Sequence, residues 1–154
     1  MTTNVLEYGH LERVRIHYDD LDQMGIVHNA RYAVLLERAL SAYWEEHGFS
    51  IANGRPTAPD VFHAVVEFSI SYRAPIRGTG DVLIHFWIDK FGQTSGVYGF
   101  RITSADGATV HAEGRRSIVR LDQRTMRPTE WTPAAREVAA TLARPALAEP
   151  EEAA

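Results

Sequence analysis

Three carboxylates precede the start of a predicted helix within the segment 18–32: Asp19, Asp20 and Asp22. Gly25 follows them closely, where the chain must turn before the helix begins. A carboxylate oxygen can act as a base or a nucleophile, and a helix N-terminus offers unpaired backbone N–H groups to an anion. Together these groups suit a reaction at a carbonyl carbon that passes through an oxyanion. The segment therefore predicts acyl chemistry.

A long helix is predicted directly after this segment, over residues 30–47. Its apolar residues recur at helical spacing and define one buried stripe. These residues are Tyr32, Leu35, Leu36, Ala39, Leu40 and Tyr43. Asn29 is a favourable N-cap residue, and Gly48 is placed to end the helix in a left-handed conformation. The helix N-terminus would then lie close to the carboxylates.

Period-two alternation predicts one strand before the helix and a run of strands after it. The Asp-Gly pair at 106–107 marks a hairpin turn. In the first strand after the helix, alternation predicts one shared face for Ala64, Val66, Phe68, Ile70 and Tyr72. The predicted strands cover residues 10–18, 64–72, 82–88, 97–103 and 110–121, and a short helix covers 133–142.

This order of elements predicts an α+β fold, in which an antiparallel sheet of about five strands wraps around one long helix, the hot-dog architecture. A chain of 154 residues with 45% hydrophobic residues can bury one core. We expect a single domain over residues 1–130. A short C-terminal helix and a mobile tail are expected over 131–154.

Composition excludes several classes of protein. The chain has no cysteine, which rules out a disulfide framework, a Cys-ligated metal and a thiol nucleophile. Its net charge of -4 argues against general nucleic-acid binding. No apolar run approaches the roughly 20 residues of a membrane span, and the N-terminus does not resemble a signal peptide. We expect a cytoplasmic protein without nucleic-acid or membrane partners.

Motifs for other chemistries are missing from the sequence. The seven histidines lie on different predicted elements, without a paired His and carboxylate at metal-ligand spacing. We therefore predict no metal. The sequence has neither a Gly-x-Ser-x-Gly elbow nor a phosphate-binding Gly loop, which disfavours a serine hydrolase and a nucleotide enzyme.

The motif around the carboxylates closely resembles the signature of the 4-hydroxybenzoyl-CoA thioesterase and YbgC-like acyl-CoA thioesterases, which have the hot-dog fold. The resemblance spans roughly residues 10 to 125. It rests on Asp20-Leu21-Asp22-Gln23-Met24-Gly25-Ile26-Val27, Tyr32, Glu37-Arg38-Ala39, Tyr72-Arg73-Ala74-Pro75, Gly80-Asp81, Gly92-Gln93-Thr94-Ser95 and Ala112-Glu113-Gly114.

The resemblance implies a thioesterase that hydrolyses acyl-CoA or acyl-carrier-protein thioesters to the free acid and thiol. It further implies a homodimer or homotetramer with sites at subunit interfaces, and no metal or organic cofactor. The family's catalytic carboxylate falls on Asp22, which would attack the carbonyl to give a mixed anhydride or act as base toward water. The backbone N–H that polarises the carbonyl falls on Asn29, at the positive end of the helix dipole.

This chain departs from the family pattern at the helix start. YbgC-like proteins carry a His at the position of Asn29, and here the nearest imidazole is His28. A backbone N–H does not depend on the side chain, so the oxyanion role of Asn29 survives this departure. His28 is the alternative catalytic side chain.

Substrate contacts are expected from the same motif and from exposed cations. Gly25, Ile26, Val27 and Tyr32 would line the thioester. Arg73, Arg77 and Lys90 would meet the phosphates of CoA at the mouth of the cleft.

The acidic residues also have structural interpretations that do not involve catalysis. Asp22 could cap a turn, and Asp19 with Asp20 could form a solvated turn or a hydrogen-bonding pair at the strand end. Glu37 is expected to support the site from the helix, and Glu67 to lie on a strand at a cleft or interface.

Two other functions remain open on the sequence alone. A hydratase or dehydratase of 3-hydroxyacyl thioesters would need a His and a carboxylate that face one substrate, which Asp22 and His28 could mimic. A noncatalytic acyl-CoA-binding protein would use the same fold without turnover.

Overall fold

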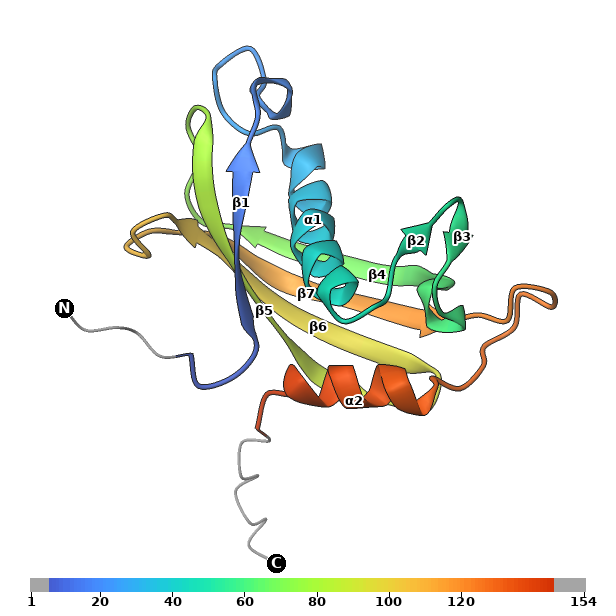
Figure 1. The fold of residues 1–154 in the computed structure, drawn as a ribbon. Helices are drawn as coiled ribbons and strands as arrows, with labels where there is room; N and C mark the ends of the chain where they lie inside the picture. The colour runs from blue at the N-terminus through green and yellow to red at the C-terminus, as the bar shows by residue number, and fades with distance from the viewer. Residues whose placement is uncertain (1–5, 146–154) are drawn as a thin grey trace, which may run out of the picture.

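A five-stranded antiparallel sheet curves around one long helix in the computed structural model, which describes residues 6–145 (Figure 1). The sheet order is β1-β5-β6-β7-β4, and a separate two-stranded hairpin pairs β2 with β3. The elements are β1 (His10–Ile16), α1 (Tyr32–Glu46), β2 (Ile51–Ala52), β3 (Arg55–Pro56), β4 (His63–Tyr72), β5 (Gly80–Phe91), β6 (Ser95–Ser104), β7 (Val110–Arg120) and α2 (Pro133–Thr141). The predicted α+β arrangement is confirmed.

The predicted stripe of α1 forms the centre of the core. All six of its residues are buried, and they pack against the inner face of the sheet. Gly48 adopts a φ of +90° just after the helix, as predicted. The start of the helix differs from the prediction, because a 3₁₀ turn over Asn29–Arg31 precedes α1 and His28 is its capping residue. Asn29 is therefore not the N-cap.

Bulges in two strands change which side chains face the core. In β4 the register with β7 shifts between Val65 and Glu67, so Val66 is an inserted residue without a partner in β7. Val66 is 62% exposed. The prediction that Ala64 and Val66 share a face with Phe68 is therefore wrong, because one inserted residue reverses the alternation. In β5 a similar shift lies between Ile88 and Lys90.

The chain after β7 returns to the sheet and adds to the core. Trp131, Ala135 and Ala139 are buried members of the same hydrophobic cluster as α1. Thr132 caps α2, because its side chain accepts a hydrogen bond from Ala135 N–H at 3.2 Å. The tail predicted to be mobile lies, from residue 146 onward, outside the described residues.

Leu36→Ala should destabilise the protein by about 2–5 kcal/mol, because Leu36 is fully buried between α1 and the sheet and its truncation leaves a cavity. Urea unfolding followed by circular dichroism measures this change. Glu46→Ala, at an exposed position near the end of the same helix, is the control and should shift the free energy of unfolding by no more than about 0.5 kcal/mol. Equal stabilities of the two variants would contradict the assigned core.

Candidate active site

The Asp22 carboxylate lies in a tight turn between β1 and the first helical turn. Its Oδ1 accepts hydrogen bonds from the backbone N–H groups of Met24, at 2.8 Å, and Ile26, at 3.2 Å. Gly25 takes a φ of +72° in this turn, which a residue with a side chain rarely adopts. Two donors on one oxygen orient the carboxylate, and Oδ2 has no hydrogen-bond partner among the described residues.

Backbone hydrogen bonds attach this turn to the segment 76–78. Val27 N–H donates to the Ile76 carbonyl at 3.0 Å, and Gly78 N–H donates to the Gly25 carbonyl at 2.8 Å. These bonds hold both sides of the turn against the chain that leads into β5. The loop that carries the Asp22 carboxylate is therefore held in place by the neighbouring backbone.

The first helical turn offers one unpaired backbone N–H group. His28 Nδ1 accepts a hydrogen bond from Ala30 N–H at 3.1 Å, and the His28 carbonyl accepts one from Arg31 N–H at 2.9 Å. No acceptor for Asn29 N–H is found within residues 6–145, and Asn29 is exposed. Asn29 N–H is thus available to an oxyanion, whereas one ring nitrogen of His28 is already engaged.

Asp20 is a fully buried carboxylate that connects this loop to α1. It accepts hydrogen bonds from His17 N–H at 2.8 Å, Arg31 Nε at 2.9 Å and Arg38 Nη1 at 3.3 Å. Burial raises its pKa, but the hydrogen bonds from His17, Arg31 and Arg38 outweigh burial, so the pKa of Asp20 lies below its usual value. Asp20 is therefore not part of a solvated turn, whereas Asp19 is exposed as expected.

Two predicted substrate-binding side chains lie in the core. Val27 is 4% exposed and Tyr32 is 3% exposed. The Tyr32 ring meets the Tyr72 ring edge-on at 5.0 Å between centroids, and Tyr72 Oη donates to the Asn29 carbonyl at 3.4 Å. Val27 and Tyr32 therefore lie beneath the turn, while Ile26 is half-buried within it.

The three predicted phosphate-binding cations are not gathered at one place. Arg77 is exposed beside the turn, where its backbone forms a bridge with Ile26. Arg73 forms a salt bridge with Glu113 at 3.1 Å. Lys90 lies near the far end of β5 from Arg77, so it is separated from the turn by most of a strand. Of the three cations, Arg77 is therefore the best placed to meet a phosphate group beside the Asp22 turn.

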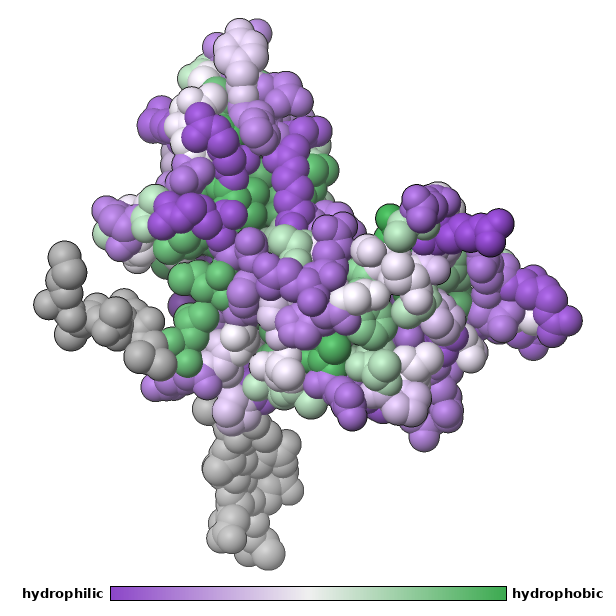
Figure 2. All heavy atoms as spheres, viewed as in Figure 1, coloured by the Kyte–Doolittle hydropathy of each residue, from purple (hydrophilic) through white to green (hydrophobic). Residues whose placement is uncertain are grey.

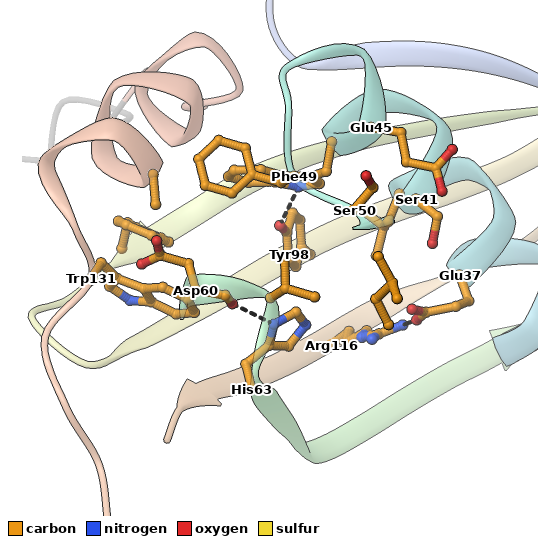
Figure 3. A pocket seen from close by; sticks show the side chains of 16 residues that line it. Glu37, Ser41, Glu45, Phe49, Ser50, Asp60, His63, Tyr98, Arg116 and Trp131 are labelled. Atoms are coloured by element: carbon orange, nitrogen blue, oxygen red, sulfur yellow. Dashed lines mark hydrogen bonds and ion pairs between the residues drawn. The ribbon is translucent and has the colours of Figure 1, made fainter. Parts of the chain in front are cut away.

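A cavity of about 420 Å³ lies toward the other end of α1 (Figure 3). Five aromatic side chains line it: Trp44, Phe49, Phe91, Tyr98 and Trp131. The Trp44 indole N–H donates to Tyr98 Oη at 2.9 Å, and burial raises the pKa of Tyr98, which stays a neutral phenol. Much of the cavity wall is therefore flat, apolar and uncharged.

Polar side chains line another part of the same cavity. Arg116 is 7% exposed and is paired with Glu37, and His63 lies near them in Figure 3. His63 Nδ1 lies 3.0 Å from the Asp60 carbonyl and donates its hydrogen to this oxygen. Glu37 supports the cavity from α1, and Glu67 is an exposed residue of β4.

Sequence reasoning did not assign His63 or Trp131 to a site. His63 lines the cavity from the start of β4, before the bulge at Val66. Trp131 reaches it from the chain after β7. Neither residue belongs to a motif, so only the folded chain brings them together.

No group of three His, Cys, Asp or Glu side chains that could hold a metal ion is found within residues 6–145. In the same part of the chain, no helix is long and apolar enough to cross a membrane.

Comparison with known proteins agrees with this fold and motif. The family described as "Thioesterase superfamily" matches residues 24–111, which include Gly25, α1 and the strands β4, β5 and β6. The chain is 30% identical over 115 residues to the acyl-CoA thioester hydrolase YbgC of Escherichia coli O157:H7, covering 75% of this chain and 84% of YbgC. It is 27% identical over 120 residues to the putative acyl-CoA thioesterase YneP of Bacillus subtilis (strain 168), covering 78% and 85% respectively.

Solved structures show the same architecture. The PA5185 protein of Pseudomonas aeruginosa strain PAO1 superposes with a TM-score of 0.79 at 24% identity, over 92% of this chain and 96% of that one. The chain therefore belongs to the thioesterase superfamily and has its hot-dog fold, which confirms the resemblance seen in the sequence.

Asp20→Asn should lower the free energy of unfolding by about 2 kcal/mol or more at pH 7, because it weakens hydrogen bonds from two arginines to a buried charge. A carboxylate whose pKa falls on folding stabilises the protein above its unfolded pKa and loses that effect as pH falls through the folded pKa. The stability difference between the two proteins should therefore shrink below about pH 4. Urea unfolding at pH 7 and pH 3 measures it, and a difference that grows in acid would contradict this role.

Proposed function

We propose that this protein hydrolyses acyl-CoA thioesters to a carboxylic acid and free CoA, with Asp22 as the catalytic carboxylate. The observation that carries the proposal is an oriented carboxylate with a free Oδ2, in the same hydrogen-bonded loop as the unpaired N–H of Asn29. The names of YbgC and YneP support CoA as the thiol carrier. An acyl-carrier-protein thioester presents the same reacting group and is a second candidate substrate.

The Asn29 N–H would donate to the thioester carbonyl oxygen at the positive end of α1. In the general-base route, Asp22 Oδ2 takes a proton from water while the water oxygen bonds to the carbonyl carbon. The π electrons of the carbonyl move to oxygen and form the oxyanion. When the oxyanion collapses, the C–S bond breaks and the leaving thiolate takes the proton from Asp22.

In the nucleophilic route, Asp22 Oδ2 itself bonds to the carbonyl carbon. The C–S bond breaks, the thiolate leaves, and a mixed anhydride remains on Asp22. Water then cleaves the anhydride into the product acid and the Asp22 carboxylate, and a proton passes to the thiolate. Both routes need the same free oxygen and the same N–H donor.

The hydratase alternative receives less support from the site. It needs an imidazole and a carboxylate directed at one substrate. The Nδ1 of His28 instead accepts from Ala30 N–H and serves as a helix cap. Noncatalytic binding of acyl-CoA remains distinct, because it does not require Asp22 to be ionised or free.

We also propose that the protein is a homodimer or homotetramer in which two copies pair along β4. This ten-residue strand is an edge of the sheet, and its neighbour in the sheet is β7 alone. Val65 and Val66 are 49% and 62% exposed on it. On the face of the molecule seen in Figure 2, patches of apolar residues lie between hydrophilic loops. A long apolar edge strand is a template for pairing with a second chain.

Asp22→Asn should lower kcat for acyl-CoA hydrolysis by about 100-fold or more, because the amide is neither a base nor a nucleophile. Thiol release from a panel of acyl-CoAs measures turnover. Asp19→Asn is the matched control, since this exposed carboxylate lies three positions away and should keep near-normal activity. If the Asp22→Asn variant hydrolyses acyl-CoA with the same kcat as the unmodified protein, Asp22 is not the catalytic group.

The double variant Val65→Glu, Val66→Glu should halve the native mass of the unmodified oligomer, because like charges would meet across the paired edges. Light scattering after size exclusion measures the mass in multiples of 17.3 kDa. Leu11→Glu, on the opposite edge strand, is the control and should leave the mass unchanged. An unmodified chain that already runs at 17.3 kDa would overturn this assembly.

A further inference from the structure

A buried arginine interrupts the apolar inner face of β7. Gly114 and Ile118 face inward two positions to either side, and Arg116 between them is only 7% exposed. Its register partner on β6 is Tyr98, and both side chains line the cavity with the aromatic walls, the aromatic cavity (Figure 3). A buried charge is costly unless its N–H groups have acceptors. The Arg116 guanidinium therefore needs acceptors within this cavity.

Protein groups satisfy only part of this guanidinium. Within residues 6–145, Glu37 Oε2 is the one hydrogen-bond acceptor found for it, and the bond uses Nη1. Nε is buried without an acceptor, and no acceptor is found for Nη2 in the same part of the chain. In a guanidinium, Nε–H and Nη2–H point the same way and form a fork that matches the two oxygens of a carboxylate. This edge of Arg116 is suited to an anion that the chain does not supply.

The charges around the cavity leave Arg116 able to attract an anion. The Asp60 carboxylate already accepts two hydrogen bonds and lies 3.8 Å from Arg120 Nε. Glu45 is exposed to solvent. The Glu37 side chain is 53% exposed, so water screens its charge, whereas the Arg116 side chain is 8% exposed. The buried positive charge is therefore only partly neutralised.

We propose that the aromatic cavity is a binding site for a small carboxylate with a compact apolar or aromatic body, whose two oxygens bind the Nε–Nη2 edge of Arg116. The inference goes beyond the proposed function, because it requires neither Asp22 nor a thioester. A volume of about 420 Å³ admits a small ligand, and the aromatic side chains offer flat surfaces to its body. Phe91 and Trp131 already stack on each other at 5.0 Å between centroids. An apolar wall and a buried cation are thus combined in one cavity.

The first experiment compares carboxylates with uncharged molecules of the same shape. Benzoate and hexanoate are titrated into the full chain beside benzamide and hexanamide, and isothermal titration calorimetry measures each Kd. Each carboxylate should bind about tenfold or more tightly than its amide, because it alone offers two acceptor oxygens and a charge to the fork. Carboxylates that bind no more tightly than their amides, or that do not bind, would overturn the proposal.

Variants of two neighbouring arginines locate the bound carboxylate. Arg116→Met removes the charge and keeps an apolar stem, so the Kd for benzoate should rise by about tenfold or more. Arg116→Lys keeps a charge without the fork and should also weaken binding. Arg115→Met is the matched control, because Arg115 is the exposed neighbour on the same strand and its loss should leave the Kd unchanged. An unchanged Kd in both Arg116 variants would place the carboxylate elsewhere and sink the proposal.

Glu37→Gln tests the charge balance without altering Arg116. The amide oxygen still accepts from Nη1 but carries no charge, so the Kd for benzoate should fall by about threefold or more. Tighter binding cannot result from a variant that fails to fold. A Kd that stays the same or rises would show that Arg116 does not attract an anion in this cavity, against the proposal.

Thioester hydrolysis identifies the source of the carboxylate, which is either a free acid or the far end of an acyl group. Glutaryl-CoA and pentanoyl-CoA have acyl chains of equal length, but only the glutaryl chain ends in a second carboxylate. If an acyl group supplies the carboxylate, Arg116→Met should lower kcat/KM for glutaryl-CoA relative to pentanoyl-CoA by about tenfold or more. If a free acid supplies it, this ratio should not change. This arm alone rests on the proposed function, so a protein that hydrolyses no thioester refutes that function and leaves the Kd comparison to decide the site.

Discussion

Burial of the apolar stripe of α1 is the constraint on which the rest of the structure depends. The stripe needs an apolar surface along the length of the helix, and the curved inner face of the sheet provides it. Once α1 lies in that curve, the helix N-terminus lies at one end of the sheet, against the chain that leads into β5. The Asp22 turn can then attach to residues 76–78 through backbone hydrogen bonds. The position of the proposed catalytic carboxylate is a consequence of core packing.

Electrostatics then separates the roles of neighbouring carboxylates. Asp20 is buried and satisfied by a backbone N–H and two arginines, so it holds the loop on α1. Asp22 uses one oxygen to define its turn and keeps the other open. Two carboxylates two positions apart are thus held differently, because Asp20 is buried with its arginines while Asp22 is only half-buried in its turn.

The cavity is built by parts of the chain that share no motif. Bulges in β4 and β5 alter the alternation, and Phe91 and His63 both face the cavity as a result. The Asp60 carboxylate accepts two hydrogen bonds from Thr132, and these bonds hold the neighbouring Trp131 against the cavity.

The sequence by itself determined the element order, because the stripe of α1 and the alternation of the strands follow directly from local spacing. It also determined the family, because the family match over residues 24–111 follows from the sequence alone. Tertiary structure alone decided that Asp20 is buried, since its arginine partners come from the turn at Asn29–Arg31 and from α1, whereas His28 caps the first turn through a local contact with Ala30 N–H. It likewise decided the face of each β4 residue, because one inserted residue reverses the alternation without a signal in composition.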